Sequence, residues 1–175
     1  MIGERIYLSP MNPDDYELYC AWLNDYEVAN NLDTYYQNLS IPAEKKFLES
    51  MCADEHHYAI IWKDTDELIG NISLMNVNHR NQTAEVGIFI GPAEYRNQGI
   101  GAEAIRLILE YGFQTLNLHN IMLFLHSDNM RGFNCYKKVG FKEYGRRREA
   151  LFKDGRHVDY IYMDILASEF AELYS

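Results

Sequence analysis

Residues 84–112, AEVGIFIGPAEYRNQGIGAEAIRLILEYG, contain the pattern from which the fold of this chain can be inferred. Its first part, 84–90, is apolar except for Glu85 and ends at Gly91-Pro92, as a strand does. A glycine-bearing loop at 96–101 follows, and apolar residues at helical spacing then predict a helix. A strand, a glycine turn and a helix in this order form an anion site, because the first helical N–H groups are unpaired at the positive end of the helix dipole.

Two glycines distinguish the loop. Gly99 and Gly101 lack the Cβ atoms that would hold a phosphate away from the backbone. The GxxxxGK[ST] pattern of a Walker loop is missing, and the turn is not a GxGxxG at the first βα unit of a doubly wound sheet. Taken alone, the two glycines also fit an ordinary tight turn. Gly87, inside the preceding strand, indicates a bulge or a close approach of another backbone.

On the N-terminal side, the pattern changes from helical to strand-like. Before residues 84–112 we expect a strand at 5–8, helices near 12–23, 25–31 and 40–52, and a hairpin of strands at 58–62 and 68–74. Asn12-Pro13 is a typical helix start with proline at its first position. The meander that leads into 84–90 is therefore antiparallel.

On the C-terminal side, the run 121–125 is apolar at every position, which predicts a strand buried on both faces. A helix is expected from Asp128-Asn129 to Gly140, followed by a closing hairpin of 141–150 and 158–166. Asn129 and Tyr136 are seven residues apart, about two turns, and so share one face of that helix. Each also has a plain structural reading, as a helix cap and as a core tyrosine.

Composition limits the class of protein. A chain of 175 residues suits one domain over 1–175, and a net charge of −10 argues against binding nucleic acid. No run approaches the about 18 apolar residues of a membrane helix, and residues 1–5 do not resemble a signal peptide. Three cysteines without a paired pattern and six scattered histidines predict free thiols and no metal site. We expect a soluble, cytoplasmic protein.

The order of these pieces carries a resemblance. Arg96-x-x-Gly99-x-Gly101, then Ser127-Asp128-Asn129, then the run from Cys135 to Phe141 with its Y-x-x-x-G-F ending, resemble the motifs of the GNAT family of N-acetyltransferases. The ending from Arg146 to Asp164 is similar to the branch that acetylates protein N-termini, polyamines and related amines. The resemblance covers nearly the whole chain. It implies an α+β fold (mixed α/β) whose mostly antiparallel central sheet is splayed in the middle and flanked by helices.

The resemblance implies a function for individual residues. Acetyl-CoA would be the co-substrate, its acetyl group passing to a primary amine by direct attack within a ternary complex. Backbone groups would bind the pantetheine arm at Ile88, Phe89 and Ile90, and the pyrophosphate along the loop Arg96, Asn97, Gln98, Gly99, Ile100, Gly101 and Ala102. Asn129 would orient the pantetheine or the acyl end, and Tyr136 would bind there too and protonate the departing thiolate. Homodimers are common among similar enzymes.

The chemistry explains the residue types. An ammonium must lose a proton before its nitrogen attacks a thioester, and tyrosine, with an ordinary pKa of about 10, is matched to an alkyl thiol. The resemblance makes Glu85 the leading candidate for the base, with His79 or a water chain as alternatives. An exposed strand carboxylate, or one paired with an arginine, is the plain structural interpretation of Glu85. A sensor that binds acyl-CoA or a partner without turnover, and a nucleotide-binding domain, are the competing interpretations. The intact Asn129 and Tyr136 disfavour the first, and the missing Walker lysine disfavours the second.

The charge is unevenly distributed. Residues 1–80 hold fourteen acidic and five basic side chains, whereas 81–175 are nearly balanced. In similar enzymes the first helices wall the acceptor site, so acidic residues there predict a cationic acceptor. These residues are Asp14, Asp15, Glu17, Asp25, Glu27 and Asp33. A solvated helical face that keeps the protein soluble is the other interpretation, and the simpler one. The acceptor stays open among a protein N-terminus, a polyamine, an aminoglycoside, an amino sugar and an amino acid.

Overall fold

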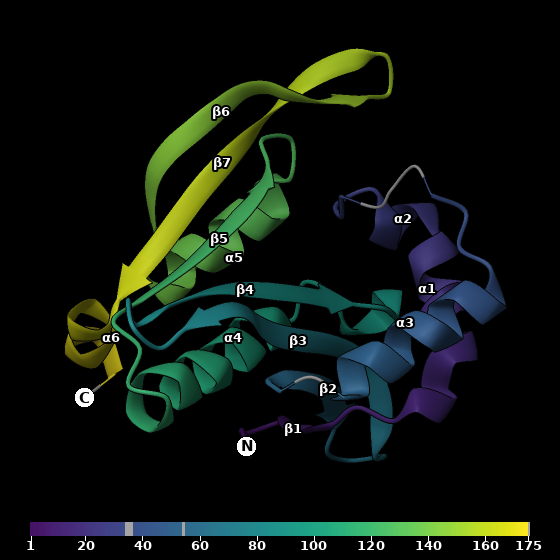
Figure 1. Ribbon diagram of the computed structural model, residues 1–175, viewed down its shortest axis with the longest axis horizontal. Coiled ribbons are helices and arrows are strands. Elements are labelled where there is room, and N and C mark those ends of the chain that lie inside the picture. The colour runs from purple at the N-terminus through teal and green to yellow at the C-terminus, as the bar shows by residue number, and fades with distance from the viewer. Residues whose placement is uncertain (34–36, 54, 175) are drawn as a thin grey trace. The chain divides into compact units, whose positions relative to one another are not determined.

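The computed structural model describes residues 1–33, 37–53 and 55–174. Its strands are β1 (Ile6–Pro10), β2 (His57–Trp62), β3 (Glu67–Asn78), β4 (Thr83–Ile90), β5 (Asn120–His126), β6 (Lys142–Lys153) and β7 (Arg156–Leu166). Its α-helices are α1 (Tyr16–Asn24), α2 (Tyr26–Ala29), α3 (Ile41–Ala53), α4 (Ile100–Glu110), α5 (Met130–Val139) and α6 (Ala167–Tyr174) (Figure 1). Single turns at Pro13–Asp15, Ala93–Tyr95 and Tyr111–Thr115 complete the elements.

Local sequence explains where the helices begin and end. The Asn12 side chain accepts a hydrogen bond from the Asp14 N–H at 3.1 Å, and proline occupies the first helical position, as predicted. Asp25 caps α2 in the same way. Gly140 adopts a left-handed φ of 116°, and its N–H bonds to carbonyls of the last turn of α5, which confirms the predicted helix end.

The sheet is mostly antiparallel. Its strand order is β1-β2-β3-β4-β5-β7-β6, and the parallel pair is β4 with β5. That pairing joins Thr83–Glu85 to Asn120–Met122 and stops there, although β4 continues to Ile90. The prediction of a mixed α and β fold with a mostly antiparallel sheet flanked by helices is confirmed.

The residues group into two compact units. The first unit is Met1–Ser73 with Ile88–Leu107, and the second unit is Leu74–Gly87 with Ile108–Ser175. The expectation of one domain stays a prediction. No helix in the described part of the chain is long and apolar enough to cross a membrane.

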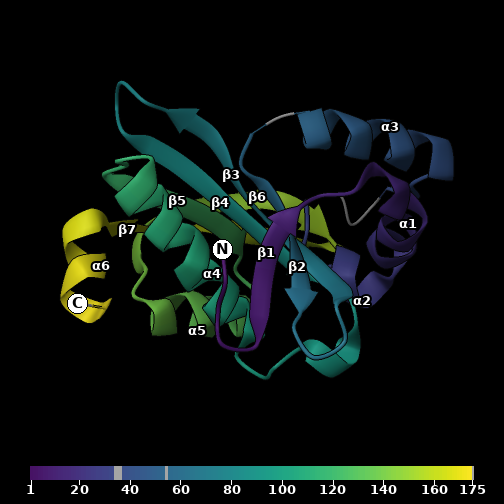
Figure 2. The same cartoon turned by 90° about the horizontal axis from the view of Figure 1, so that it is seen from below.

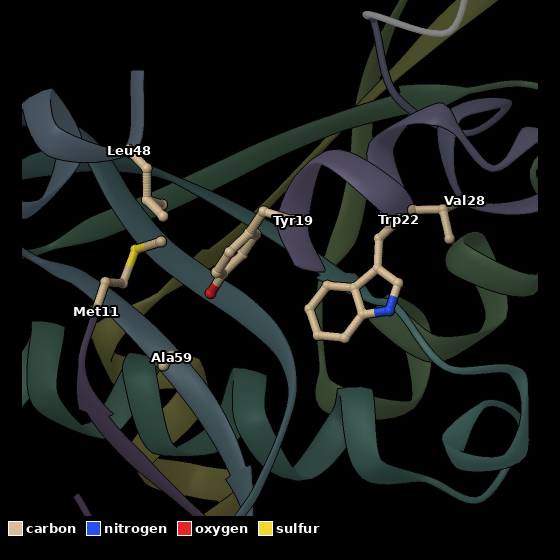
Figure 3. Close-up of a cluster of buried hydrophobic side chains, with 6 residues drawn as sticks. All are labelled: Met11, Tyr19, Trp22, Val28, Leu48 and Ala59. Carbon is tan, nitrogen blue, oxygen red and sulfur yellow. The ribbon is translucent and has the colours of Figure 1, made fainter. Parts of the chain in front are cut away.

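The first unit has an aromatic core beneath its helices. α1 lies beside α3 (Figure 2), and together with β2 they bury a cluster around Tyr19 and Trp22 (Figure 3). The Tyr19 and Trp22 rings meet edge to face, with centroids 5.5 Å apart. Phe89 of β4 packs edge-on against both rings, at 6.0 and 6.2 Å. The core of this unit therefore supports the C-terminal half of β4.

The second unit buries one face of β5. Ile121, Leu123 and Leu125 are at most 3% exposed, and Ile165 of β7 lies on the same buried side. The prediction of a strand buried on both faces is wrong, because the alternate residues of β5 are mostly only half-buried. Their side chains meet the rings of β7 instead, with Phe124 5.1 Å from Tyr160 and 5.9 Å from Tyr162. Aromatic pairs across strands explain why an all-apolar run can leave one face partly open.

The closing hairpin is longer than predicted. β6 runs to Lys153 and β7 begins at Arg156, so the strands flank the expected turn at 154–155 directly (Figure 1). Register shifts between Arg147 and Leu151 absorb the extra residues. The sequence interpretation did not include α6, whose Phe170 is buried and packs 5.4 Å from Phe113.

Candidate active site

The backbone of the loop 96–102 is left-handed at two residues. Gly99 has a φ of 81° and Asn97 a φ of 60°, both in the left-handed region. α4 begins at Ile100, and the Glu103 N–H bonds to the Gly99 carbonyl at 3.0 Å. The amides of Ile100, Gly101 and Ala102 precede this first intrahelical bond, so the helix itself leaves them without an acceptor. The loop has the donors that an anion needs.

The Arg96 side chain is used inside the protein. Its side chain is 8% exposed, and its guanidinium donates to the Ile90 carbonyl at 3.3 Å and to the Gly91 carbonyl. It also pairs with the Glu27 carboxylate of α2 at 3.1 Å. The arginine of the motif therefore anchors the end of β4 and α2 to the loop, and its backbone N–H is also used inside the protein, by the Ala93 carbonyl at 3.1 Å.

The strand that precedes the loop is closely packed on both sides. A Cβ atom at Gly70 of β3 would lie 2.2 Å from the Phe89 carbonyl oxygen, and one at Gly91 would lie 2.2 Å from the Trp22 ring. Ile88, Phe89 and Ile90 are half-buried and belong to the first unit, as the loop does. The bond from Arg96 to Ile90 connects these two predicted binding segments directly.

Asn129 and Tyr136 lie on α5 in the second unit. The Asn129 side chain caps the helix, because its Oδ1 accepts the Gly132 N–H at 2.9 Å. The plain cap reading is therefore true, and the Asn129 amide nitrogen is the group left for a ligand. Burial raises the pKa of Tyr136 well above its ordinary value of 10.0. The hydroxyl is therefore protonated at neutral pH. Within 1–33, 37–53 and 55–174 no group hydrogen-bonds it, so its proton is available to a ligand.

Glu85 lies on an acidic and aromatic sheet face. It is half-buried, is paired with Met122 on β5, and accepts a hydrogen bond from the Asn76 side chain at 3.4 Å. Met122 is in turn opposite Asp164 on β7. Burial raises the pKa of the Tyr144 hydroxyl, and the charges of Asp164 and Glu85 raise it further. The negative charges of two carboxylates therefore reach one tyrosine hydroxyl on this face.

Sequence reasoning missed this neighbourhood of Glu85. Asp164 and Tyr144 are 79 and 59 residues away along the chain. The register of β4, β5 and β7 aligns Glu85, Met122 and Asp164, and the hydroxyl of Tyr144 on β6 reaches the Met122 sulfur at 3.7 Å. No spacing rule could have found them. His79, the alternative base, is exposed in the turn between β3 and β4.

Some acidic residues of the first helices make structural contacts, and others are exposed. Asp25 caps α2, and Glu27 pairs with Arg96, so both have structural roles. Burial, with a smaller effect from the neighbouring Asp14 charge, raises the pKa of Asp15 above its ordinary value. Asp14 and Glu17 are exposed. Of these residues, Asp14, Asp15 and Glu17 would therefore contribute most to an attraction for cations.

The remaining side chains provide no metal centre in the described part of the chain. No group of three or more His, Cys, Asp or Glu residues there could hold an ion. Cys20, Cys52 and Cys135 are free thiols, and burial raises the pKa of the Cys135 thiol.

Comparisons with known proteins identify the type of chain. The model of the acetyltransferase (GNAT) domain matches residues 5–142. An uncharacterized N-acetyltransferase, p20, of Bacillus licheniformis is 26% identical over 177 residues, covering 96% of both chains. A spermidine N(1)-acetyltransferase of Vibrio cholerae is 36% identical over 103 residues, covering 59% of each. A crystal structure of spermidine N-acetyltransferase from Vibrio cholerae in complex with CoA and spermine has a TM-score of 0.85 at 24% identity, covering 95% of this chain and 98% of that one.

Proposed function

Because the chain belongs to the GNAT acetyltransferase family, we propose that it moves an acetyl group from acetyl-CoA to a cationic primary amine. The observation that carries the proposal is the loop 96–102, whose left-handed Gly99 and unpaired first amides open α4 within the matched residues. The pyrophosphate of acetyl-CoA would bind these amides, and its pantetheine arm the backbone of Ile88–Ile90. A cytoplasmic location and a homodimer are part of the proposal.

The proposed proton transfers use Tyr136 and Glu85. Glu85, directly or through water, would accept a proton from the ammonium substrate. The neutral nitrogen then attacks the thioester carbonyl, the carbon–sulfur bond breaks, and the thiolate takes the proton of the Tyr136 hydroxyl. The nitrogen, cationic after its attack, gives its second proton to the tyrosinate directly or through water, which leaves the neutral amide and restores Tyr136. Burial raises the pKa of Tyr136, which keeps the proton on the hydroxyl at neutral pH but makes Tyr136 a weaker acid toward the departing thiolate than an ordinary tyrosine.

A polyamine is the acceptor class that the comparisons favour. The named relatives include spermidine N(1)-acetyltransferases of Escherichia coli and Vibrio cholerae. The charge of −10, concentrated in residues 1–80, would raise the local concentration of a polycation. The carboxylates of Glu85 and Asp164, near the rings of Tyr144 and Tyr162, would suit an alkylammonium chain.

An amine panel tests the proposal. Free thiol released from acetyl-CoA is measured with spermidine, spermine, a monoamine of equal length, an aminoglycoside, an amino sugar, amino acids and a peptide N-terminus, and the acetylated product is identified by mass. We expect the highest kcat/KM with the polyamines, falling as salt is added. Equal activity with the neutral-tailed monoamine at all salt concentrations would contradict a cationic acceptor. Calorimetry with acetyl-CoA, CoA and ATP separates this function from nucleotide binding, and CoA binding without turnover of any amine would indicate a sensor.

A further inference from the structure

Arg5, just before β1, connects three parts of the first unit. Its Nη1 donates to the Gln98 carbonyl of the loop at 2.8 Å, and its Nε donates to the Glu103 carboxylate of α4 at 3.0 Å. Its backbone N–H donates to the same carboxylate at 2.8 Å. One residue distant in sequence therefore holds both the loop and the first turn of α4.

The remaining nitrogen of Arg5 lies beside the loop glycine. Nη2 is 3.5 Å from the position that a Cβ atom would take at Gly99. The side chain is 38% exposed, and in the described residues neither N–H of Nη2 has a hydrogen-bond partner. Arg96, the cation within the loop, has its guanidinium occupied by Ile90, Gly91 and Glu27. Arg5 is therefore a cation with unused donors next to the predicted anion site.

Glu103 makes a cation at this place necessary. It is 6% exposed and lies in the first turn of α4, where its charge would repel a phosphate. Burial alone would raise the pKa of Glu103. Hydrogen bonds from the Arg5 N–H and guanidinium, and from the Ile6 N–H, outweigh burial and hold the pKa below its ordinary value. The carboxylate is therefore ionised at neutral pH, and the Arg5 charge compensates it.

We propose that Arg5 is a binding residue for the pyrophosphate of CoA, contributing the Nη2 hydrogens while Nε and Nη1 hold α4 and the loop in place. The inference rests on the proposed function, because that function supplies the diphosphate. A planar guanidinium suits this double task, since its donors point in fixed directions and can serve two acceptors and an anion at once.

Calorimetry with CoA and 3′-dephospho-CoA tests the contact. Arg5→Gln should weaken the binding of both ligands about ten-fold or more, the usual loss for one hydrogen bond to a charged group. Lys46→Gln, on the exposed surface of α3, removes the same charge and should leave both affinities within about two-fold. Unchanged affinity in Arg5→Gln would overturn the proposal. A loss confined to CoA would also overturn it, because it would assign Arg5 to the 3′-phosphate.

A double variant separates contact from support. In Arg5→Gln/Glu103→Gln the buried carboxylate is neutral, so repulsion and the unpaired charge are both removed. If Arg5 touches the pyrophosphate, the double variant still binds CoA weakly, and Arg5→Lys recovers part of the affinity. A return of the double variant to the wild-type affinity would show that Arg5 acts only on Glu103. Wild-type protein that fails to bind CoA would refute the proposed function itself, whereas normal wild-type binding with normal Arg5→Gln binding refutes the Arg5 contact alone.

Discussion

Replacing Gly91 by alanine tests the packing that supports the loop. A Cβ atom at this position would lie 2.2, 2.3 and 2.7 Å from three ring carbons of Trp22. Carbon atoms in contact are about 3.5 Å apart, so the 2.2 Å approach requires a displacement of about 1.3 Å. Trp22 is 9% exposed and is held edge to face by Tyr19 and Phe89, so the ring cannot retreat into solvent.

The cost follows from this overpacking. Forcing extra carbon into a well-packed core costs about 1–3 kcal/mol. A domain of this length loses about 2–4 °C of Tm per kcal/mol, so Gly91→Ala should lower Tm by about 2–12 °C. The Gly91 N–H bonds to the Ile69 carbonyl at 2.9 Å and its carbonyl accepts from Arg96, so the backbone is held from both sides.

Thermal unfolding followed by circular dichroism measures the effect. Gly145→Ala is the matched control, because no atom lies within 4 Å of the added Cβ. Gly145 lies within β6, and Gly91 directly follows β4. It should keep or slightly raise Tm, since alanine restricts the unfolded chain. In a Trp22→Leu background, Gly91→Ala should cost less than in the wild type. An equal cost in both backgrounds, or a Gly91→Ala protein as stable as Gly145→Ala, would refute the collision.

Three further outcomes are expected. Tyr136→Phe should lower kcat ten-fold or more with little change in acetyl-CoA affinity, because a general acid typically contributes about 10²–10⁴-fold to the rate. An unchanged single-turnover rate would exclude Tyr136 as the general acid. Asp128→Asn should destabilise the fold by about 2 kcal/mol in denaturant titrations, because it removes an anionic partner, 3.1 Å away, of the buried Lys153. Arg156→Gln, which removes an exposed partner of Asp128, should cost less than about 1 kcal/mol, and equal costs would contradict this ranking. Glu103, whose folded pKa is below the ordinary 4.5, stabilises the protein fully above about pH 5, and this stabilisation is lost as the pH falls through the folded pKa. Glu103→Gln should therefore lower Tm at pH 7 by more than it does at pH 3, and a gap independent of pH would contradict the assignment.

Local patterns predicted most of the secondary structure. Helix starts such as Asn12-Pro13 and the stop at Gly140 depend on a few neighbouring residues, so they could be read without the fold. The burial of the two faces of β5 could not be predicted in this way. An apolar run indicates burial but does not say whether helices or cross-strand aromatic rings cover each side, and here Phe124 meets Tyr160 and Tyr162.

The candidate site also has one part that local sequence predicts and one part that depends on the fold. The sequence alone predicted the glycine loop before α4 with Gly99 in it, since a left-handed turn before a helix is a property of consecutive residues. Which arginine has unused donors beside this loop could be seen only in the folded chain. The guanidinium of Arg96 is occupied by carbonyls and a carboxylate of the protein, whereas Arg5, more than ninety residues earlier, reaches the loop with donors to spare. A contact across that separation depends on how strand and helix pack, which no local pattern encodes.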